Sequence, residues 1–151
     1  MINLTPAILT KRIRPDQSGY TVAAGATAVN SDRVDTAGYE GVRFIIGFGA
    51  IVSGAVTSVK ARQNTVDSDT GMADLEGSGQ AVADTDDNKI VIVEIHRPRE
   101  RYVQLSTSRA TQNATIDFLL VELIGPRVQP VTQDATVVGA EVFNSPQEGT
   151  A

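Results

Sequence analysis

The side chains of this 151-residue chain are strongly biased toward branching at Cβ. Valine, threonine and isoleucine supply 18, 15 and 11 residues, against only 7 leucines. β-Branched side chains lose rotamer freedom in a helix and pack well on the pleated surface of a sheet. Helical domains of this size rely on leucine, so the bias predicts an all-β protein. The length predicts one domain, and the hydrophobic content of 41% is enough for a core.

Apolar runs separated by turn residues predict seven or eight short strands. The expected strands cover residues 7–14, 20–22, 27–29, 42–49, 56–63, 89–95, 101–107 and 115–124. Strand 42–49 should be buried on most of both faces, and strand 56–63 should pair with it as the next strand. No stretch repeats its apolar residues every 3.6 positions, so we expect little or no helix. Strands at this spacing are typical of a β-sandwich or jelly roll.

Three regions are expected along the chain. Residues 1–19 should form an N-terminal arm with the first strand, residues 20–127 the sandwich core, and residues 128–151 an extended C-terminal arm. The last region contains no lysine or arginine but keeps several apolar side chains. These are Val137, Val138, Val142 and Phe143. They suit an arm that becomes ordered on a partner, with a plain disordered tail as the alternative.

The segment from residue 64 to residue 88 contains seven acids and no basic residue. Within it, Asp67-Ser68-Asp69-Thr70-Gly71 is partly similar to a calcium loop. The glycine stands at the fifth position of the motif instead of the sixth, and no glutamate follows at the twelfth. We therefore predict solvated turn aspartates, with a bound cation as the alternative. No metal site and no cofactor is predicted.

The titratable residues argue against several classes of protein. The chain has 13 basic and 18 acidic side chains, one histidine and no cysteine. Any general acid–base or serine-triad scheme must use His96, and no Gly-x-Ser-x-Gly motif supplies a nucleophile, so we expect no enzyme. A net charge of −5 argues against general binding of nucleic acid. No apolar run approaches the roughly 18 residues that a membrane span needs.

Arg97, Arg99 and Arg101 alternate along the chain at a predicted hairpin between two strands. A period of two places all three on one face if the segment is extended. Arginine is planar, carries five donors and suits contacts with anions. We expect a surface for an anionic partner, either protein carboxylates or phosphate. A solubilising hairpin edge is the alternative.

Four stretches carry a resemblance to a known group of proteins. They are residues 34–42 (VDTAGYEGV), residues 73–78 (ADLEGS), residues 97–103 (RPRERYV) and residues 145–151 (SPQEGTA). In this order the chain resembles small structural proteins of tailed bacteriophages that are encoded near the major capsid protein. Within that group it is most similar to capsid cement, or decoration, proteins with a jelly-roll-like β fold.

The resemblance implies a structural virion protein without cofactor or catalytic residue. Such a protein is made in the host cytoplasm, binds the outer surface of the capsid between capsomers and stabilises the shell. Its expected partners are the major capsid protein and further copies of itself, as a homodimer or homotrimer, with no nucleic acid and no membrane. Residues 1–14, Arg97–Arg101 and residues 128–151 should make these contacts. The alternatives are a head–tail or tail-associated structural protein, or a receptor- or carbohydrate-binding β module.

Overall fold

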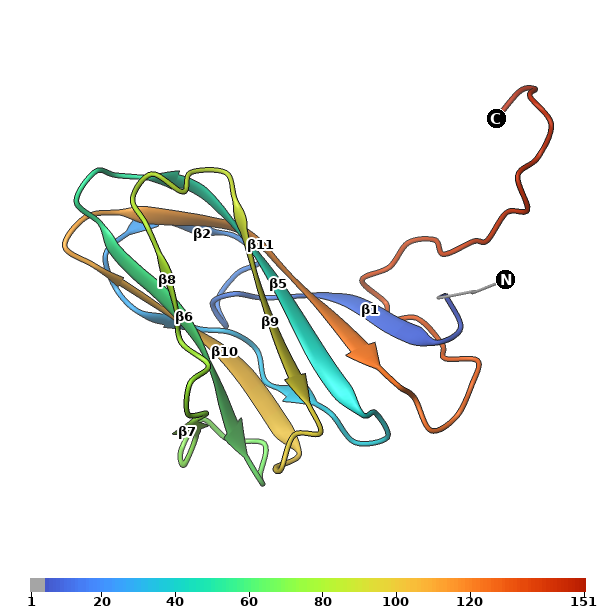
Figure 1. Ribbon diagram of the computed structural model, residues 1–151, viewed down its shortest axis with the longest axis horizontal. Coiled ribbons are helices and arrows are strands. Elements are labelled where there is room, and N and C mark those ends of the chain that lie inside the picture. Colours follow the sequence, from blue (N-terminus) through green and yellow to red (C-terminus); the bar gives the residue numbers. More distant parts are fainter. Residues whose placement is uncertain (1–4) are drawn as a thin grey trace.

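The structure is a computed structural model that describes residues 5–151, and every regular element in them is a β-strand. The strands are β1 (Ile8–Ile13), β2 (Val22–Gly25), β3 (Val29–Asn30), β4 (Val34–Asp35), β5 (Gly41–Ile51), β6 (Val56–Asn64), β7 (Ala73–Asp74), β8 (Gln80–Val82), β9 (Ile90–His96), β10 (Tyr102–Ala110) and β11 (Ala114–Ile124). They form two antiparallel sheets packed on each other (Figure 1). The prediction of an all-β sandwich is therefore confirmed.

The first sheet has the strand order β1-β11-β5-β9, and β2 also pairs with β11. Its longest pairing joins β5 to β11, from Gly41 opposite Ile124 to Ile51 opposite Ala114. Alternation along β5 buries Phe44, Ile46 and Phe48 against the second sheet. Most of β5 is buried, as its continuous apolar run predicted.

The second sheet has the order β3-β10-β6-β7, with β4 also on β10 and β8 also on β6. Val59 and Ala61 of β6 and Val103 and Leu105 of β10 point inward and close the core. The short strands β7 and β8 belong to the acidic segment between residues 64 and 88.

Arg109 joins the two sheets inside the core, where it is only 5% exposed. It lies on β10, and its Nη1 donates to the carbonyls of Ala23 and Ala114 at 2.9 and 2.7 Å. Its Nε donates to the carbonyl of Thr27 at 2.9 Å. Burial lowers the pKa of this guanidinium, which nonetheless stays charged at neutral pH. One side chain thus satisfies backbone acceptors at the edge where the sheets meet.

Two predicted pairings are wrong. Strand β6 does not pair with β5: it pairs with β10 in the second sheet, while β5 lies between β11 and β9 in the first. Likewise, β9 and β10 belong to different sheets, so residues 97–101 are not a hairpin loop but a crossover between the sheets. A strand has the same inward apolar pattern in either sheet. The sequence pattern therefore does not show where the chain crosses from one sheet to the other.

The first part of the C-terminal arm runs along the free edge of β1. The N–H of Val131 donates to the carbonyl of Pro6 at 3.0 Å. Gln133 accepts from the N–H of Thr10 at 2.8 Å, and Thr136 accepts from the N–H of Arg12 at 2.9 Å. These side chains satisfy the outward-facing donors of an edge strand. Beyond Ala140, which still lines a hollow beside β1, the arm extends away from the sandwich (Figure 1).

Residues 7–14, predicted as a strand or an extended arm, contain edge strand β1 (Ile8–Ile13). The expectation that residues 1–14 contact a partner includes residues 1–4, which lie outside the described residues. No helix able to span a membrane occurs in the part of the chain that the structure describes.

Candidate interaction surfaces

Three connections meet at one end of the sandwich because of the strand register. Gly41, the first residue of β5, stands opposite Ile124 at the end of β11 and opposite His96 at the end of β9. The turn before β5, the crossover after β9 and the chain leaving β11 therefore lie together. The crossover contains the three arginines that the sequence singled out.

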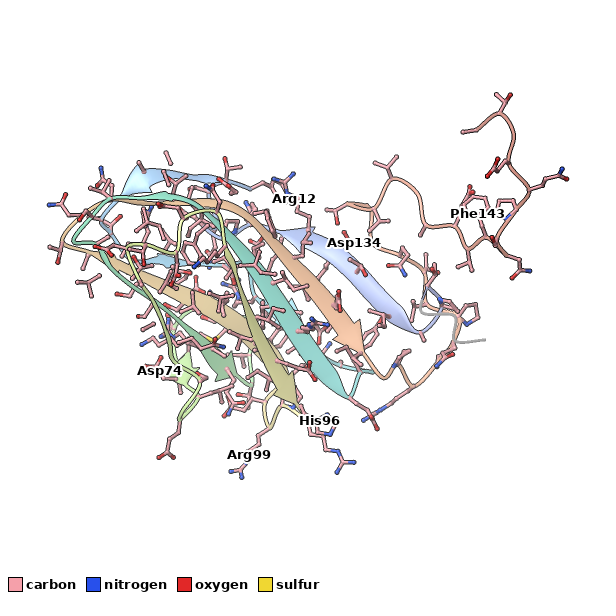
Figure 2. All side chains as sticks on the ribbon, turned by 45° about the horizontal axis from the view of Figure 1, so that its top comes forward. Arg12, Asp74, His96, Arg99, Asp134 and Phe143 are labelled. Atoms are coloured by element: carbon pink, nitrogen blue, oxygen red, sulfur yellow. The ribbon has the colours of Figure 1, made fainter. Side chains whose placement is uncertain are left out.

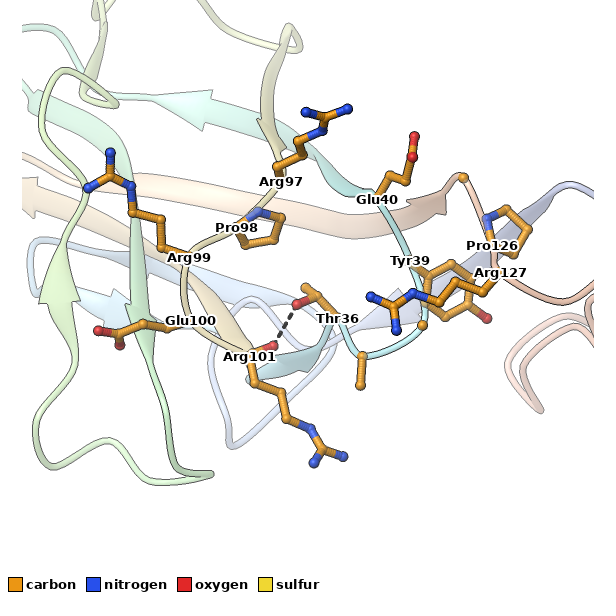
Figure 3. Close-up of a pocket in the computed structure, with 13 residues that line it drawn as sticks. Thr36, Tyr39, Glu40, Arg97, Pro98, Arg99, Glu100, Arg101, Pro126 and Arg127 are labelled. Carbon is orange, nitrogen blue, oxygen red and sulfur yellow. Dashed lines mark hydrogen bonds between the residues drawn. The ribbon is translucent and has the colours of Figure 1, made fainter.

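These connections enclose an open cleft of about 900 Å³, which we call the arginine cleft (Figure 3). Its lining comprises residues 36–40, residues 97–101 and residues 125–127. Four arginines lie in this lining, Arg97, Arg99, Arg101 and Arg127, against two glutamates, Glu40 and Glu100. On a protein of net charge −5, this end carries an excess of positive charge.

Backbone hydrogen bonds fix the walls of the arginine cleft. The N–H of Arg97 donates to the carbonyl of Glu40 at 2.7 Å, and the N–H of Arg127 donates to that of Gly38 at 2.9 Å. Both the N–H and the hydroxyl of Thr36 donate to the carbonyl of Arg101, the latter at 2.7 Å. The surface that the arginines present is therefore built by the fold.

Three residues with a positive φ angle shape the same cleft: Gly38, Arg97 and Gly125. Gly125 has a φ of 64°, and a Cβ at this position would lie 2.8 Å from Cβ of Glu40, so glycine is required there. Arg97 has a φ of 50°, which is uncommon for a residue with a side chain. The crossover is thus not extended, and Arg97, Arg99 and Arg101 do not share one face. Figure 3 shows the Arg101 side chain directed away from those of Arg97 and Arg99.

The arginines of the cleft differ in their pairing. Arg101 binds Asp35 through Nε and Nη2, each at 2.8 Å, and this contact raises the pKa of Arg101 and lowers the pKa of Asp35. Within residues 5–151, Arg97, Arg99 and Arg127 make no ion pair. Free guanidinium groups are strong bidentate donors to carboxylate and phosphate. Arg97, Arg99 and Arg127 are therefore the groups available to an anionic partner, and Arg101 is committed to the fold.

The paired aspartates of the acidic segment are held by an arginine that the sequence analysis did not single out. Arg33 contacts Asp67 at 2.5 Å and Asp69 at 2.8 Å. Asp69 also accepts from Gln17 and from the buried Gln104. Burial alone would raise the pKa of Asp69, but these hydrogen bonds outweigh it and lower the pKa.

A second acidic cluster in the same segment, Asp84-Thr85-Asp86-Asp87, also serves backbone groups. Asp84 accepts from the N–H of Gly54 at 2.6 Å, and Asp87 accepts from the N–H of Ile51 at 2.5 Å. Among residues 5–151, no group of three or more histidine, aspartate and glutamate side chains is arranged to hold a metal ion. The aspartates of both clusters act as turn anchors in this fold.

The predicted apolar residues of the C-terminal arm lie far from the arginine cleft, as the positions of Phe143 and Arg99 in Figure 2 show. Val137 is half-buried and lines a hollow of about 480 Å³ beside β1. Val138, Val142 and Phe143 are 106%, 49% and 70% exposed. The structure therefore divides the seven predicted residues between two separate surfaces.

Sequence reasoning missed Arg127, Tyr39 and Glu40 as lining residues of the cleft. The available signals were Gly38 and Gly125-Pro126, which mark the turns at the ends of two long apolar strands. Those turns become neighbours only once β5 and β11 are known to pair. No protein-family model matches the sequence, and a search of curated proteins finds no match.

Proposed function

We propose that this chain is a structural virion protein that binds the outer surface of a phage capsid between capsomers and stabilises the shell. The proposal takes up the resemblance to capsid cement proteins, including their jelly-roll-like topology as the finer description of the sandwich. The observation that carries it is the distal C-terminal arm. Val138, Val142 and Phe143 are exposed there, on a segment that extends away from its own fold.

An arm of this kind suits attachment to an assembled surface. Apolar side chains held in water gain free energy when a partner buries them, by about 25 cal/mol for each Å². Two contact surfaces on one small protein also raise its avidity for a repeating lattice above that of either contact. The shell is then stabilised by mass action, since the ligand binds the assembled state better than the separated subunits.

The arginine cleft supports a second contact in the same proposal. Three guanidinium groups without an ion pair lie on a wall fixed by backbone hydrogen bonds, on a protein that is acidic as a whole. This combination favours carboxylates of a neighbouring protein subunit over general binding to a polyanion. The major capsid protein is the proposed source of those carboxylates.

Binding to empty shells of the phage that encodes the chain tests the proposal. Purified protein is mixed with shells, the shells are sedimented, and bound protein and the temperature of shell disruption are measured. We expect saturable binding at a fixed ratio to the capsid subunits and a raised disruption temperature. Removal of residues 138–151 should abolish binding while the sandwich stays folded.

A charge-matched pair of variants tests the arginine cleft. The variant R97Q/R99Q/R127Q should bind shells at least tenfold more weakly. The control K11Q/K60Q/K89Q removes three positive charges outside the cleft lining and should bind as the parent does. Equal losses in both variants would point to net charge alone, and normal occupancy by the arm-less chain would contradict the proposal. Rings of six or twelve copies without shell binding would favour the head–tail alternative.

A further inference from the structure

The outer face of the first sheet carries a band of apolar side chains that points to solvent. In the register of the sheet, Ile45 of β5 stands between Leu120 of β11 and Ile92 of β9. Gly47, two residues further on, stands between Phe118 and Ile90. We call Ile45, Ile90, Ile92, Phe118 and Leu120 the outer apolar band.

The band is a continuous surface, because Gly47 leaves room for an aromatic ring. A Cβ at Gly47 would lie within 3 Å of Cε1, Cζ and Cδ1 of Phe118, so the ring of Phe118 lies directly over the glycine. Ile45, Phe118 and Leu120 are half-buried, whereas Ile90 and Ile92 remain 54% and 39% exposed. The band therefore runs from the middle of the sheet to β9, its edge strand.

An exposed apolar edge of this kind is unusual for a face that meets water. Antiparallel sheets commonly alternate apolar residues inward with polar residues outward. Contiguous apolar patches on a protein surface mark contacts with other molecules, and a long apolar edge strand invites association. The outer apolar band is therefore a candidate binding surface, and the C-terminal arm is the segment of this chain best suited to cover it.

The chain's own arm starts on this face but stops short of the band. Gln133, Val137 and Ala140 line the hollow beside β1 together with Arg43 and Glu122. In the register, Arg43 and Glu122 form the row next to Ile45 and Leu120. The arm therefore reaches the neighbouring row of side chains and then leaves the sheet (Figure 1).

The remainder of the arm has the length and composition to cover such a band on another molecule. Residues 141–151 span about 35 Å when extended, against about 15 Å across four strands of a sheet. They carry Val142 and Phe143 for apolar contact and Glu141 and Glu148 without any basic residue. On the receiving face, Arg43 is the basic residue next to the band: its Nη1 pairs with Glu122 at 3.6 Å, and its Nε has no hydrogen-bond partner.

A second copy is favoured over the arm's own sheet by the direction of the chain. The arm leaves the sheet beyond Ala140 and extends away from the sandwich, so the same molecule does not place the exposed Val142 and Phe143 on its own band (Figure 1). Each copy has one arm and one band. An exchange of arms between copies therefore satisfies both surfaces in a closed dimer or ring.

We propose that the outer apolar band binds the distal arm, residues 138–151, of a second copy of this chain. The inference goes beyond the proposed shell contact: it adds a contact between copies of the chain and names the two surfaces that produce it. Phe143 and Val142 pack against Ile92, Ile90 and Phe118 of the neighbour. In the free oligomer Val142 and Phe143 are thereby occupied, and Val138 and the arginine cleft remain available for contact with the shell.

Sedimentation equilibrium of the purified chain, without shells, tests this exchange. The full chain should form a dimer or a small closed oligomer. The arm-less chain, lacking residues 138–151, and the band variant I90S/I92S should each associate at least tenfold more weakly. The control V56S/V66S changes two valines, 62% and 56% exposed, that lie outside the first sheet and should associate as the parent does.

Mixing the two defective chains separates exchange from other modes of association. The arm-less chain keeps an intact band, and I90S/I92S keeps an intact arm, so an equimolar mixture should form a heterocomplex that neither chain forms alone. A monomeric full chain, an arm-less chain that associates normally, or a mixture that stays monomeric would each overturn the proposal. A monomer that still saturates shells overturns only the exchange, whereas an oligomer that ignores shells overturns only the shell-binding function.

Discussion

The outer faces of the two sheets differ sharply, although both sheets close the same core. On the second sheet, Gln104 stands opposite Arg62 and Ser106 stands opposite Lys60. On the first sheet, the corresponding central positions are Ile45 and Leu120. Along the strands of both sheets, every second residue points outward. These outward residues are polar on the second sheet and apolar on the first.

The covering of the two faces explains this difference. Gln104 is fully buried because the chain's own loops lie over it, where its Nε2 donates to the carbonyl of Ser31 and to Asp69, each at 2.8 Å. On the first sheet, the described chain leaves Ile90 and Ile92 in water. The polar face is thus completed by loops of the same molecule, and the apolar face has the character of a surface completed by another molecule. Substitutions on one face, on the other, or in the shared interior should therefore have different effects.

The largest expected effect comes from Arg109, which links both sheets from within the core. The change R109M keeps the length of the side chain but leaves the carbonyls of Thr27, Ala23 and Ala114 without their donor. Buried acceptors that lose a charged donor cost about 3 kcal/mol in the free energy of unfolding. Urea denaturation measures the loss, and hydrogen exchange should rise together in β10 and β11. Faster exchange in one sheet alone would show that Arg109 belongs to that sheet and does not link the two.

A smaller loss should follow from Q104L, which alters only the polar face. The leucine keeps the volume but removes the donor to Ser31 and Asp69, and we expect the free energy of unfolding to fall by about 2 kcal/mol. Because loops cover this position, the variant should also expose the 66–72 loop to proteolysis. The matched substitution S108L replaces an exposed residue of the same strand and should leave the loop protected. Equal proteolysis of both variants would contradict the role of Gln104 as a loop anchor.

The sequence predicted the strands well and their pairing poorly. The core strands β5, β9, β10 and β11 follow from apolar runs between turn residues, because that pattern depends on nearby residues. The partner of β6 depends on which sheet the chain enters after residues 52–55, and both routes bury the same side chains. Residues 97–101 were misassigned as a hairpin for the same reason, since a five-residue connection serves either a hairpin or a crossover.

The candidate surfaces were predictable in part. Arg97 and Arg99 were found from their spacing, and the structure leaves both without an ion pair, but the spacing did not reveal that Arg101 pairs with Asp35. Arg127 was missed because it reaches the arginine cleft through the β5–β11 pairing. The outer apolar band was missed as well, although Gly47 within a buried strand was a signal of a close approach. A glycine of this kind indicates that another group comes close to the strand, but the sequence does not show which residue it is.

Acid should weaken the polar face, because its carboxylates are the ones held by donors. Hydrogen bonds from Gln17, Arg33 and Gln104 overcome the effect of burial and lower the pKa of Asp69, and the hydrogen bond from Arg101 lowers the pKa of Asp35. A carboxylate with a lowered pKa in the folded state stabilises the fold above the pKa of an unfolded aspartate, about 3.9. That stability is lost as the pH falls below this value and through the folded pKa.

The urea midpoint measured from about pH 6 down to about pH 3 tests this acid dependence. The full chain should lose stability mainly below about pH 4. D69N should start from a lower midpoint and change less with pH, because it has already lost part of that stability. E76Q removes one acid from the same segment and controls for charge. If D69N kept the full acid dependence, the hydrogen bonds to Asp69 would not be a source of stability.

The smallest effect on folding is expected on the apolar face. A small change in stability there would show that the chain does not cover this face itself. Ile92 is 39% exposed in a single chain. In the arm-less chain, where no exchange of arms takes place, I92T should therefore change the free energy of unfolding by less than about 0.5 kcal/mol. Threonine keeps the β-branch and suits a strand, which isolates the loss of apolar surface. In the full chain the same change should weaken self-association, because there Ile92 contacts the arm of a neighbour. A loss above about 1 kcal/mol in the arm-less chain would mean that Ile92 is packed by its own molecule, and the contrast between a self-covered face and a partner-covered face would then disappear.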